Sequence, residues 1–204
     1  MFALKLERVL AEKGIHYAWF MAFISFFLLM FSSSAASTPA VLMLPIIKAF
    51  GWSITDISAI IGALFIIVAV AAPFGTAFML HLGLTKIVVI SCVSLIAGLG
   101  LTTFALEKWH LFFSMGTLLG LASGILSLGF AATVATRWFV EKRGLVLGIL
   151  AASWAAGQIM LVPFIAWIVS NFDWQYGVIP GITGAGVCLL LFIFLVRIGH
   201  QILV

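Results

Sequence analysis

Charged and apolar positions in this chain are segregated over stretches as long as whole helices. Small clusters of charge bound six charge-free runs, which are residues 14–47, 57–85, 87–106, 109–136, 144–172 and 174–196. A helix that crosses the hydrocarbon core of a bilayer needs about 20 predominantly apolar residues, so each run is long enough for one span and too short for two. The short alternating segments of barrel strands are absent. The pattern predicts an all-α integral membrane protein with six transmembrane helices.

Composition supports the same class and excludes several others. The 204 residues are 65% hydrophobic and 8% charged, whereas soluble domains are about 25% charged. Cys92 and Cys188 lie inside apolar runs, which argues against a disulfide scaffold or a metal cluster. The net charge of +4 comes from ten scattered basic residues, which form no stripe for nucleic acid. The remaining partners to expect are the lipid bilayer and a small molecule.

The basic residues predict the orientation in the membrane, because Lys and Arg favour the cytoplasmic side. Lys48 and Lys108 would lie on the side opposite to the N-terminus. On the same side as the N-terminus are Lys5, Arg8, Lys13, Lys86, Arg137, Lys142, Arg143 and Arg197. We therefore expect a multi-pass protein of the inner or plasma membrane with both termini in the cytoplasm. The predicted parts are a cytoplasmic segment 1–16, a six-helix bundle 17–198 and a cytoplasmic end 199–204.

The N-terminus admits one other interpretation. A basic leader, an apolar stretch and then Ser32–Ser37 imitate a cleavable signal peptide. The apolar pattern resumes at Pro39–Ile47, which favours a first span that stays attached. Ser53 followed by Asp56 fits a capping box at the start of the second span, so we interpret Asp56 as a helix cap and not as a proton or substrate site.

An internal repeat is visible at an offset of ninety residues. It places Ala72-Pro73-Phe74 on Val162-Pro163-Phe164. Three spans separate the copies, and an odd number of spans would invert the second copy in the membrane, as in many transporters. We therefore expect two inverted three-helix repeats, with a chance match of two common residues as the alternative.

Small residues recur every four positions in the fourth and fifth spans. Such spacing lets helix backbones approach closely in lipid. We predict helix packing, with sliding surfaces of a moving transporter as the alternative interpretation. The glycines concerned are Gly116, Gly120, Gly124, Gly144 and Gly148.

Catalytic chemistry has little support in the sequence. The four histidines lie at or beyond span ends without metal-ligand spacing, and no nucleophile has a base beside it. We expect no enzyme activity, no metal and no cofactor. Polar residues at mid-depth must bond to another helix, to their own helix or to a cavity. The candidates for a substrate path are Ser34, Ser123, Ser127, Trp154 and Gln158.

The segment R-W-F-V-E-K-R-G-L-V-L-G-I-L-A-A-S-W-A-A-G-Q, residues 137–158, resembles the link between the fourth and fifth helices of the major facilitator superfamily. It is most similar to the monocarboxylate-transporter and oxalate:formate-antiporter branch. The first helix and the start of the second helix in prokaryotic members are similar to Ile15-His16-Tyr17-Ala18-Trp19, Leu44-Pro45 and Phe50-Gly51-Trp52-Ser53. The resemblance covers the whole chain, which would correspond to the N-terminal six-helix half of a twelve-helix fold.

The resemblance implies transport of a small organic solute, with a monocarboxylate as the candidate, by rocking against a second six-helix bundle or a homodimer partner. It also implies a cytoplasmic gate formed by Arg137, Glu141, Lys142 and Arg143. The chain departs from the family pattern after the second span, where Leu80 and His81 stand in place of an acid and an arginine. The usual gating is therefore in doubt, and the alternative function is a truncated, non-transporting membrane protein or scaffold.

Overall fold

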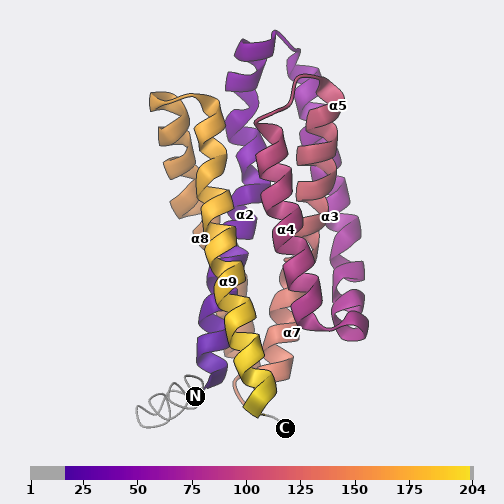
Figure 1. The fold of residues 1–204 in the computed structure, drawn as a ribbon, viewed down its shortest axis with the longest axis vertical. Coiled ribbons are helices and arrows are strands. Elements are labelled where there is room, and N and C mark those ends of the chain that lie inside the picture. Colours follow the sequence, from indigo (N-terminus) through magenta and orange to yellow (C-terminus); the bar gives the residue numbers. More distant parts are fainter. Residues whose placement is uncertain (1–16, 203–204) are drawn as a thin grey trace.

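The computed structural model describes the backbone of residues 17–202 and the side chains of residues 18–194. Every regular element in that range is a helix (Figure 1). The elements are α2 (Tyr17–Phe50), α3 (Ile54–Leu82), α4 (Leu84–Thr102), α5 (Lys108–Leu111), the π-helix η1 (Phe112–Leu119), α6 (Gly120–Ile125), α7 (Leu128–Trp138), α8 (Arg143–Asn171), the 3-10 helix η2 (Trp174–Val178) and α9 (Ile179–Ile202).

Six segments of this range are long and apolar enough to cross a membrane, which confirms the six predicted spans. The fourth span, Lys108–Trp138, is assembled from α5, η1, α6 and α7. The first described helix begins and the last one ends at the same end of the bundle (Figure 1). The predicted segment 1–16 lies outside the described residues, and α9 continues through the predicted boundary at 198 to Ile202.

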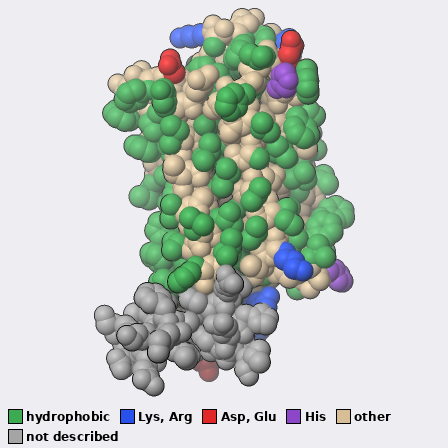
Figure 2. Space-filling model, in the orientation of Figure 1, with side chains coloured by type: hydrophobic (Ala, Val, Ile, Leu, Met, Phe, Trp, Pro, Cys, Tyr) green, Lys and Arg blue, Asp and Glu red, His purple; other side chains and the backbone are tan. Residues whose placement is uncertain are grey.

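The outer surface is apolar along the length of the bundle. In Figure 2 hydrophobic side chains cover the described part of the visible face, while charged and histidine side chains gather towards its two ends. Inside the bundle, α2 packs mainly against α8 and α9, and α3 packs mainly against the fourth span. This distribution suits a protein surrounded by hydrocarbon and bounded by water at each end.

Two buried apolar clusters fill the interior. One holds Ala18 to Leu29 of α2 and continues at Leu126 of the fourth span. The other starts at Ala35 along α2 and reaches Ala122 along the fourth span. Ser32, Ser33 and Ser34 separate the clusters along α2, and Ser123 separates them along the fourth span. All four serines are at most 1% exposed, so a buried polar layer divides the core near its middle.

Candidate functional site

The fourth span is interrupted between α6 and α7. Leu126 (φ −84°, ψ 58°) and Ser127 (φ −119°, ψ −159°) both leave the helical region. No proline causes the break, but Gly124 and Gly129 flank it, and glycine is a weak helix former. Non-helical backbone at membrane depth is tolerated where it is buried in protein or lines a cavity, and both conditions hold here.

Neighbouring groups satisfy part of the interrupted backbone. The Ser32 hydroxyl donates to the Leu126 carbonyl oxygen at 3.4 Å, and the Leu126 N–H still donates to the Ala122 carbonyl at 2.9 Å. Ser127 is the N-cap of α7, but its side chain makes no capping hydrogen bond. The first amides of α7 therefore lack intrahelical acceptors and carry the partial positive charge of a helix N-terminus.

A cavity of about 630 Å³ lies against the break. We call it the break cavity. Four spans contribute to its wall, so no single helix defines it. The lining residues are Leu29 of α2; Val68, Ala72, Pro73 and Thr76 of α3; Ser127, Leu128, Gly129 and Ala131 at the start of α7; and Leu150, Ala151, Ser153 and Trp154 of α8.

The structure brings two of the five predicted path residues to this cavity. Ser127, at the start of α7, and Trp154, on α8, are half-buried and both line the cavity. Gln158 is exposed one turn beyond Trp154 and does not line the break cavity.

The other two predicted path residues lie in the buried polar layer. Ser34 donates to the carbonyl of Phe31 at 3.1 Å within its own helix. The hydroxyl of Ser123 is buried without a hydrogen-bond partner. An additional residue, Ser33, donates to the Trp154 carbonyl at 2.7 Å and so joins α2 to α8 at a residue that lines the cavity.

The predicted gate residues lie where α7 ends and α8 begins. The Nε of Arg143 donates to the Phe139 carbonyl at 2.6 Å, which ties the start of α8 to the end of α7. Arg137, Glu141 and Lys142 are exposed. Arg137 lines a separate pocket of about 570 Å³ together with His81 and Thr133. Among the described residues, the ion pair joins Lys108 to Asp56, and none of the described carboxylates pairs with Arg137.

The predicted packing glycines fall into two groups. A Cβ placed on Gly120 would lie 3.1 Å from the Leu64 carbonyl oxygen, and one on Gly124 would lie 2.7 Å from the Val68 carbonyl oxygen. Gly116 lies less tightly against α3, where a Cβ would be 3.9 Å from the Ile60 carbonyl oxygen. A Cβ on Gly144 or Gly148 would meet nothing within 4 Å, so these two glycines present an open face of α8.

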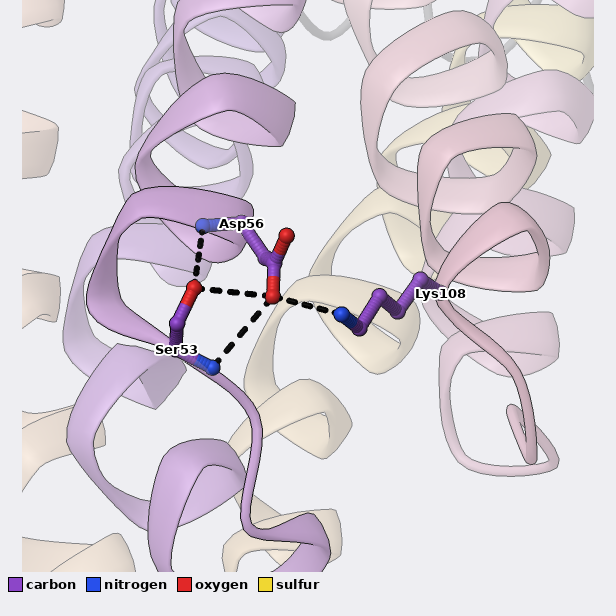
Figure 3. Close-up of polar contacts among 3 residues, drawn as sticks. All are labelled: Ser53, Asp56 and Lys108. Atoms are coloured by element: carbon purple, nitrogen blue, oxygen red, sulfur yellow. Dashed lines mark hydrogen bonds and ion pairs between the residues drawn. The ribbon is translucent and has the colours of Figure 1, made fainter.

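The predicted capping box is present at the start of α3, and it has an additional partner. The Asp56 N–H donates to the Ser53 hydroxyl at 3.1 Å, and the Ser53 N–H donates to the Asp56 carboxylate at 3.3 Å. Lys108 Nζ reaches the same carboxylate at 2.6 Å from the start of α5 (Figure 3). The ion pair fastens the second span to the fourth at this end of the bundle, as expected for a structural role of Asp56.

The sequence analysis did not anticipate three features of the site. These are the break at Leu126–Ser127, the cavity position of Thr76 and the ion pair of Lys108. The signal that could have marked the break is a group of weak helix formers: Ser123, Gly124, Ser127 and Gly129. Thr76 carries no such signal, because its place depends on how closely Gly129 lets α7 approach α3.

Comparisons with known proteins agree with this architecture. The family model for the Major Facilitator Superfamily matches residues 19–201. The chain is 30% identical over 162 residues to Monocarboxylate transporter 9 of Pongo abelii, which covers 72% of this chain and 30% of that protein. It is 29% identical over 106 residues to Monocarboxylate transporter 13 of Rattus norvegicus, which covers 51% of this chain and 24% of that protein. The matches therefore span less than a third of the length of these relatives.

Proposed function

The chain belongs to the major facilitator superfamily, and on that premise we propose that it forms the N-terminal six-helix bundle of a transporter that moves a small organic solute by alternating access. The observation that carries the proposal is the break cavity, where an interrupted span exposes backbone at mid-depth. Interrupted helices of this kind form the substrate and ion sites of many transporters. The bundle offers the polar groups of such a site without any charged residue in the cavity wall.

We propose a monocarboxylate as the substrate. Two relatives are named as monocarboxylate transporters, and the N-terminus of α7 favours a negatively charged group beside Ser127. The indole of Trp154 and the side chains of Val68 and Leu150 supply the apolar part of the wall. A small molecule with one carboxylate and a short apolar body fits both features.

A second bundle, or a second copy of this chain, would complete the transport path. Within an apolar stretch of 18 residues, only 22% of the residues are buried in α3 and in α8, against 67% in the corresponding stretch of α2. Both helices line the break cavity and also carry outward-facing apolar side chains, such as Phe65 on α3 and Met160 on α8. We propose that the partner covers these two helices and encloses the cavity.

The proposed inverted repeat has support from the packing. The offset of ninety residues relates Met30 of α2 to Gly120 of α6, and Ile67 of α3 to Gly157 of α8. Both resulting pairs are close contacts: Gly157 lies against the Met30 backbone, and Gly120 lies against Ile67. Equivalent contacts at equivalent positions are what a pseudo-twofold relation between the two halves predicts.

Uptake into proteoliposomes tests the function. We expect saturable uptake of radiolabelled pyruvate or lactate when the chain is reconstituted as a homodimer or together with a second bundle. Ala151→Trp should abolish uptake because the indole would fill the break cavity, whereas Ser170→Ala, at the far end of α8, should leave it unchanged. Uptake by a strictly monomeric chain would contradict the proposal, because one bundle alone leaves the cavity open.

The scaffold alternative predicts a different set of results. A packing scaffold would transport nothing and would lose assembly on Gly120→Leu or Gly148→Leu, while Gln158→Ala would leave assembly intact. A transporter should lose uptake with the two glycine changes and keep it with Gln158→Ala, because Gln158 does not line the break cavity. Chemical cross-linking of membranes that contain each variant, measured beside uptake, separates the two functions.

A further inference from the structure

A second large hollow lies on the outside of the bundle, between α8 and α9. The two helices are joined through η2, which packs against both, but they make little direct contact with each other. The space between them is an apolar groove of about 840 Å³. Its lining residues are Phe31 of α2; Leu161, Phe164 and Ile168 of α8; Phe172 and Tyr176 at the turn; and Ile179, Pro180, Thr183, Gly184 and Val187 of α9.

The floor of the groove is built from a close approach of α2 and α9. The ring of Phe31 lies directly against Gly184, where a Cβ would have no room. Gly184 is buried, whereas Thr183 and Val187 on either side of it are exposed along the rim. Phe31 and Gly184 therefore close the floor at this point, and the groove shares no lining residue with the break cavity.

A series of aromatic rings follows the α8 side of the groove. Ring centroids of Phe164 and Trp167 are 6.3 Å apart, those of Trp167 and Phe172 are also 6.3 Å apart, and those of Phe172 and Tyr176 are 6.2 Å apart. The series ends in Tyr176, which is half exposed beside the turn. Trp and Tyr prefer the boundary between hydrocarbon and headgroups, so the turn end of the groove is its headgroup end.

The groove offers almost nothing for a polar ligand to bind. Its polar side chains are Thr183 and Tyr176. The Thr183 hydroxyl already donates to the Ile179 carbonyl of its own helix at 2.9 Å. An occupant with buried polar groups would leave them unsatisfied deep in the groove, which is costly in hydrocarbon. The chemistry of the wall selects an apolar occupant.

The length of the groove matches one leaflet of the bilayer. Its α9 side runs from Ile179 to Val187, which at 1.5 Å per residue is about 12 Å. One leaflet contributes about half of a hydrocarbon core that is about 30 Å thick. The open side continues into the exposed apolar surface formed by Phe164, Val187 and Leu190, so the groove is an extension of the surface that faces lipid.

From these features we infer that the groove is a binding site for one acyl chain of a membrane phospholipid, with the headgroup beside Tyr176. The chain lies between α8 and α9 over Phe31 and supplies the packing contacts that those two helices do not make with each other. An empty groove would forfeit those dispersion contacts. The inference depends on the bundle spanning a membrane and on the proposed partner leaving the α9 side of α8 open to lipid; it does not depend on the identity of the solute.

Photolabelling tests the site in the 204-residue chain. The probe is a phosphatidylcholine with a diazirine near the middle of one acyl chain, mixed into phosphatidylcholine vesicles that contain the protein. After illumination, mass spectrometry of peptides maps the adducts. We expect adducts at Phe164, Ile168 and Val187 well above those at Ile90 and Val93, which are exposed on α4.

Substitutions that fill the groove provide the decisive comparison. Thr183→Trp should reduce the groove adducts to the level found on α4, and Val93→Trp, a change of similar size outside the groove, should leave them unchanged. Val187→Trp fills the same groove if Thr183→Trp does not fold. Equal labelling of groove and α4 would overturn the inference, as would groove adducts that persist in a folded filling variant. Loss of the adducts in a homodimer but not in a monomer would assign the groove to a protein partner and would also overturn it.

Discussion

Single glycines decide how closely the helices of this bundle approach. At Gly157 a Cβ would overlap the backbone carbonyl oxygen of Met30, and this contact lies beside the Ser33–Trp154 hydrogen bond that joins the same two helices. In lipid no hydrophobic force drives helices together, so packing and interhelical hydrogen bonds hold them. The α2–α8 contact is therefore sensitive to a single methyl group at residue 157.

Gly157→Ala tests that sensitivity. We expect it to destabilise the bundle by about 1–3 kcal/mol, the usual cost of forcing a methyl group into a packed site. Gly148→Ala is the matched control on the same helix, because a Cβ there would meet nothing within 4 Å. It should leave stability unchanged or raise it by up to about 1 kcal/mol, since alanine is the better helix former. Reversible unfolding in detergent measures both variants, and equal stability of the two would contradict the structure.

At the scale of elements, the fourth span is the one whose behaviour differs most from a regular helix. It contains a π-helical stretch, Phe112–Leu119, and then the break at Leu126 and Ser127. Four-residue glycine spacing does not locate such a break, and weak helix formers mark only where a break is tolerated, because tertiary contacts stabilise it. The Ser32 hydroxyl that bonds to the broken backbone comes from α2, and most of the cavity wall beside the break comes from α2, α3 and α8.

Hydrogen exchange should reveal the break directly. The amides of Leu128, Gly129 and Phe130 are the first of α7 and have no intrahelical acceptor, and the break cavity lies against the first two. We expect them to exchange faster than the amides of Ala131 to Ala135 in the same helix. Exchange measured by mass spectrometry on the protein in nanodiscs, with overlapping peptides from residues 120–138, provides the test. Uniform protection across this segment would indicate a continuous helix.

Much of the fold at this scale was predictable from the sequence. Spacing of charges locates the six spans because burying charge in hydrocarbon is costly, and the Ser53–Asp56 pair identifies the start of α3 because a capping box depends only on local geometry. The site was less predictable. Ser127 and Trp154 could be placed at cavity depth by counting, but counting along a run does not give the rotation of each helix. Gln158 therefore lies on the exposed side of α8, and Ser34 bonds within α2.

For the whole molecule, the positions of charge relative to the spans predict the topology. Val140 lies between α7 and α8 and is 82% exposed, and Leu106 lies between α4 and α5 and is 76% exposed. Positive charge beside the connection between α7 and α8 predicts that Val140 is cytoplasmic and that Leu106 lies on the opposite side of the membrane. Both native cysteines are buried, so a new cysteine at either position should dominate labelling by a thiol reagent.

Labelling of intact cells with a membrane-impermeant maleimide checks the topology. Leu106→Cys should react in intact cells, and Val140→Cys should react only after the membrane is opened. The reverse pattern would place the termini outside and would remove the basis for a cytoplasmic gate at Arg137. Labelling of both positions in intact cells would show that the preparation is leaky, which a cytoplasmic marker protein controls.

The contact between α3 and the first half of the fourth span also restricts how the bundle can move. Gly116, Gly120 and Gly124 face the carbonyls of Ile60, Leu64 and Val68, so the same contact recurs once per turn along both helices. Displacement by a fraction of a turn would drive side chains into backbone at Gly120 and Gly124, where the contacts are tightest. The positions available to one helix along the other are thus separated by about 5.4 Å, the pitch of an α-helix. A movement smaller than that step must carry α3 and the first half of the fourth span together as one rigid body. The fourth span then bends at its break.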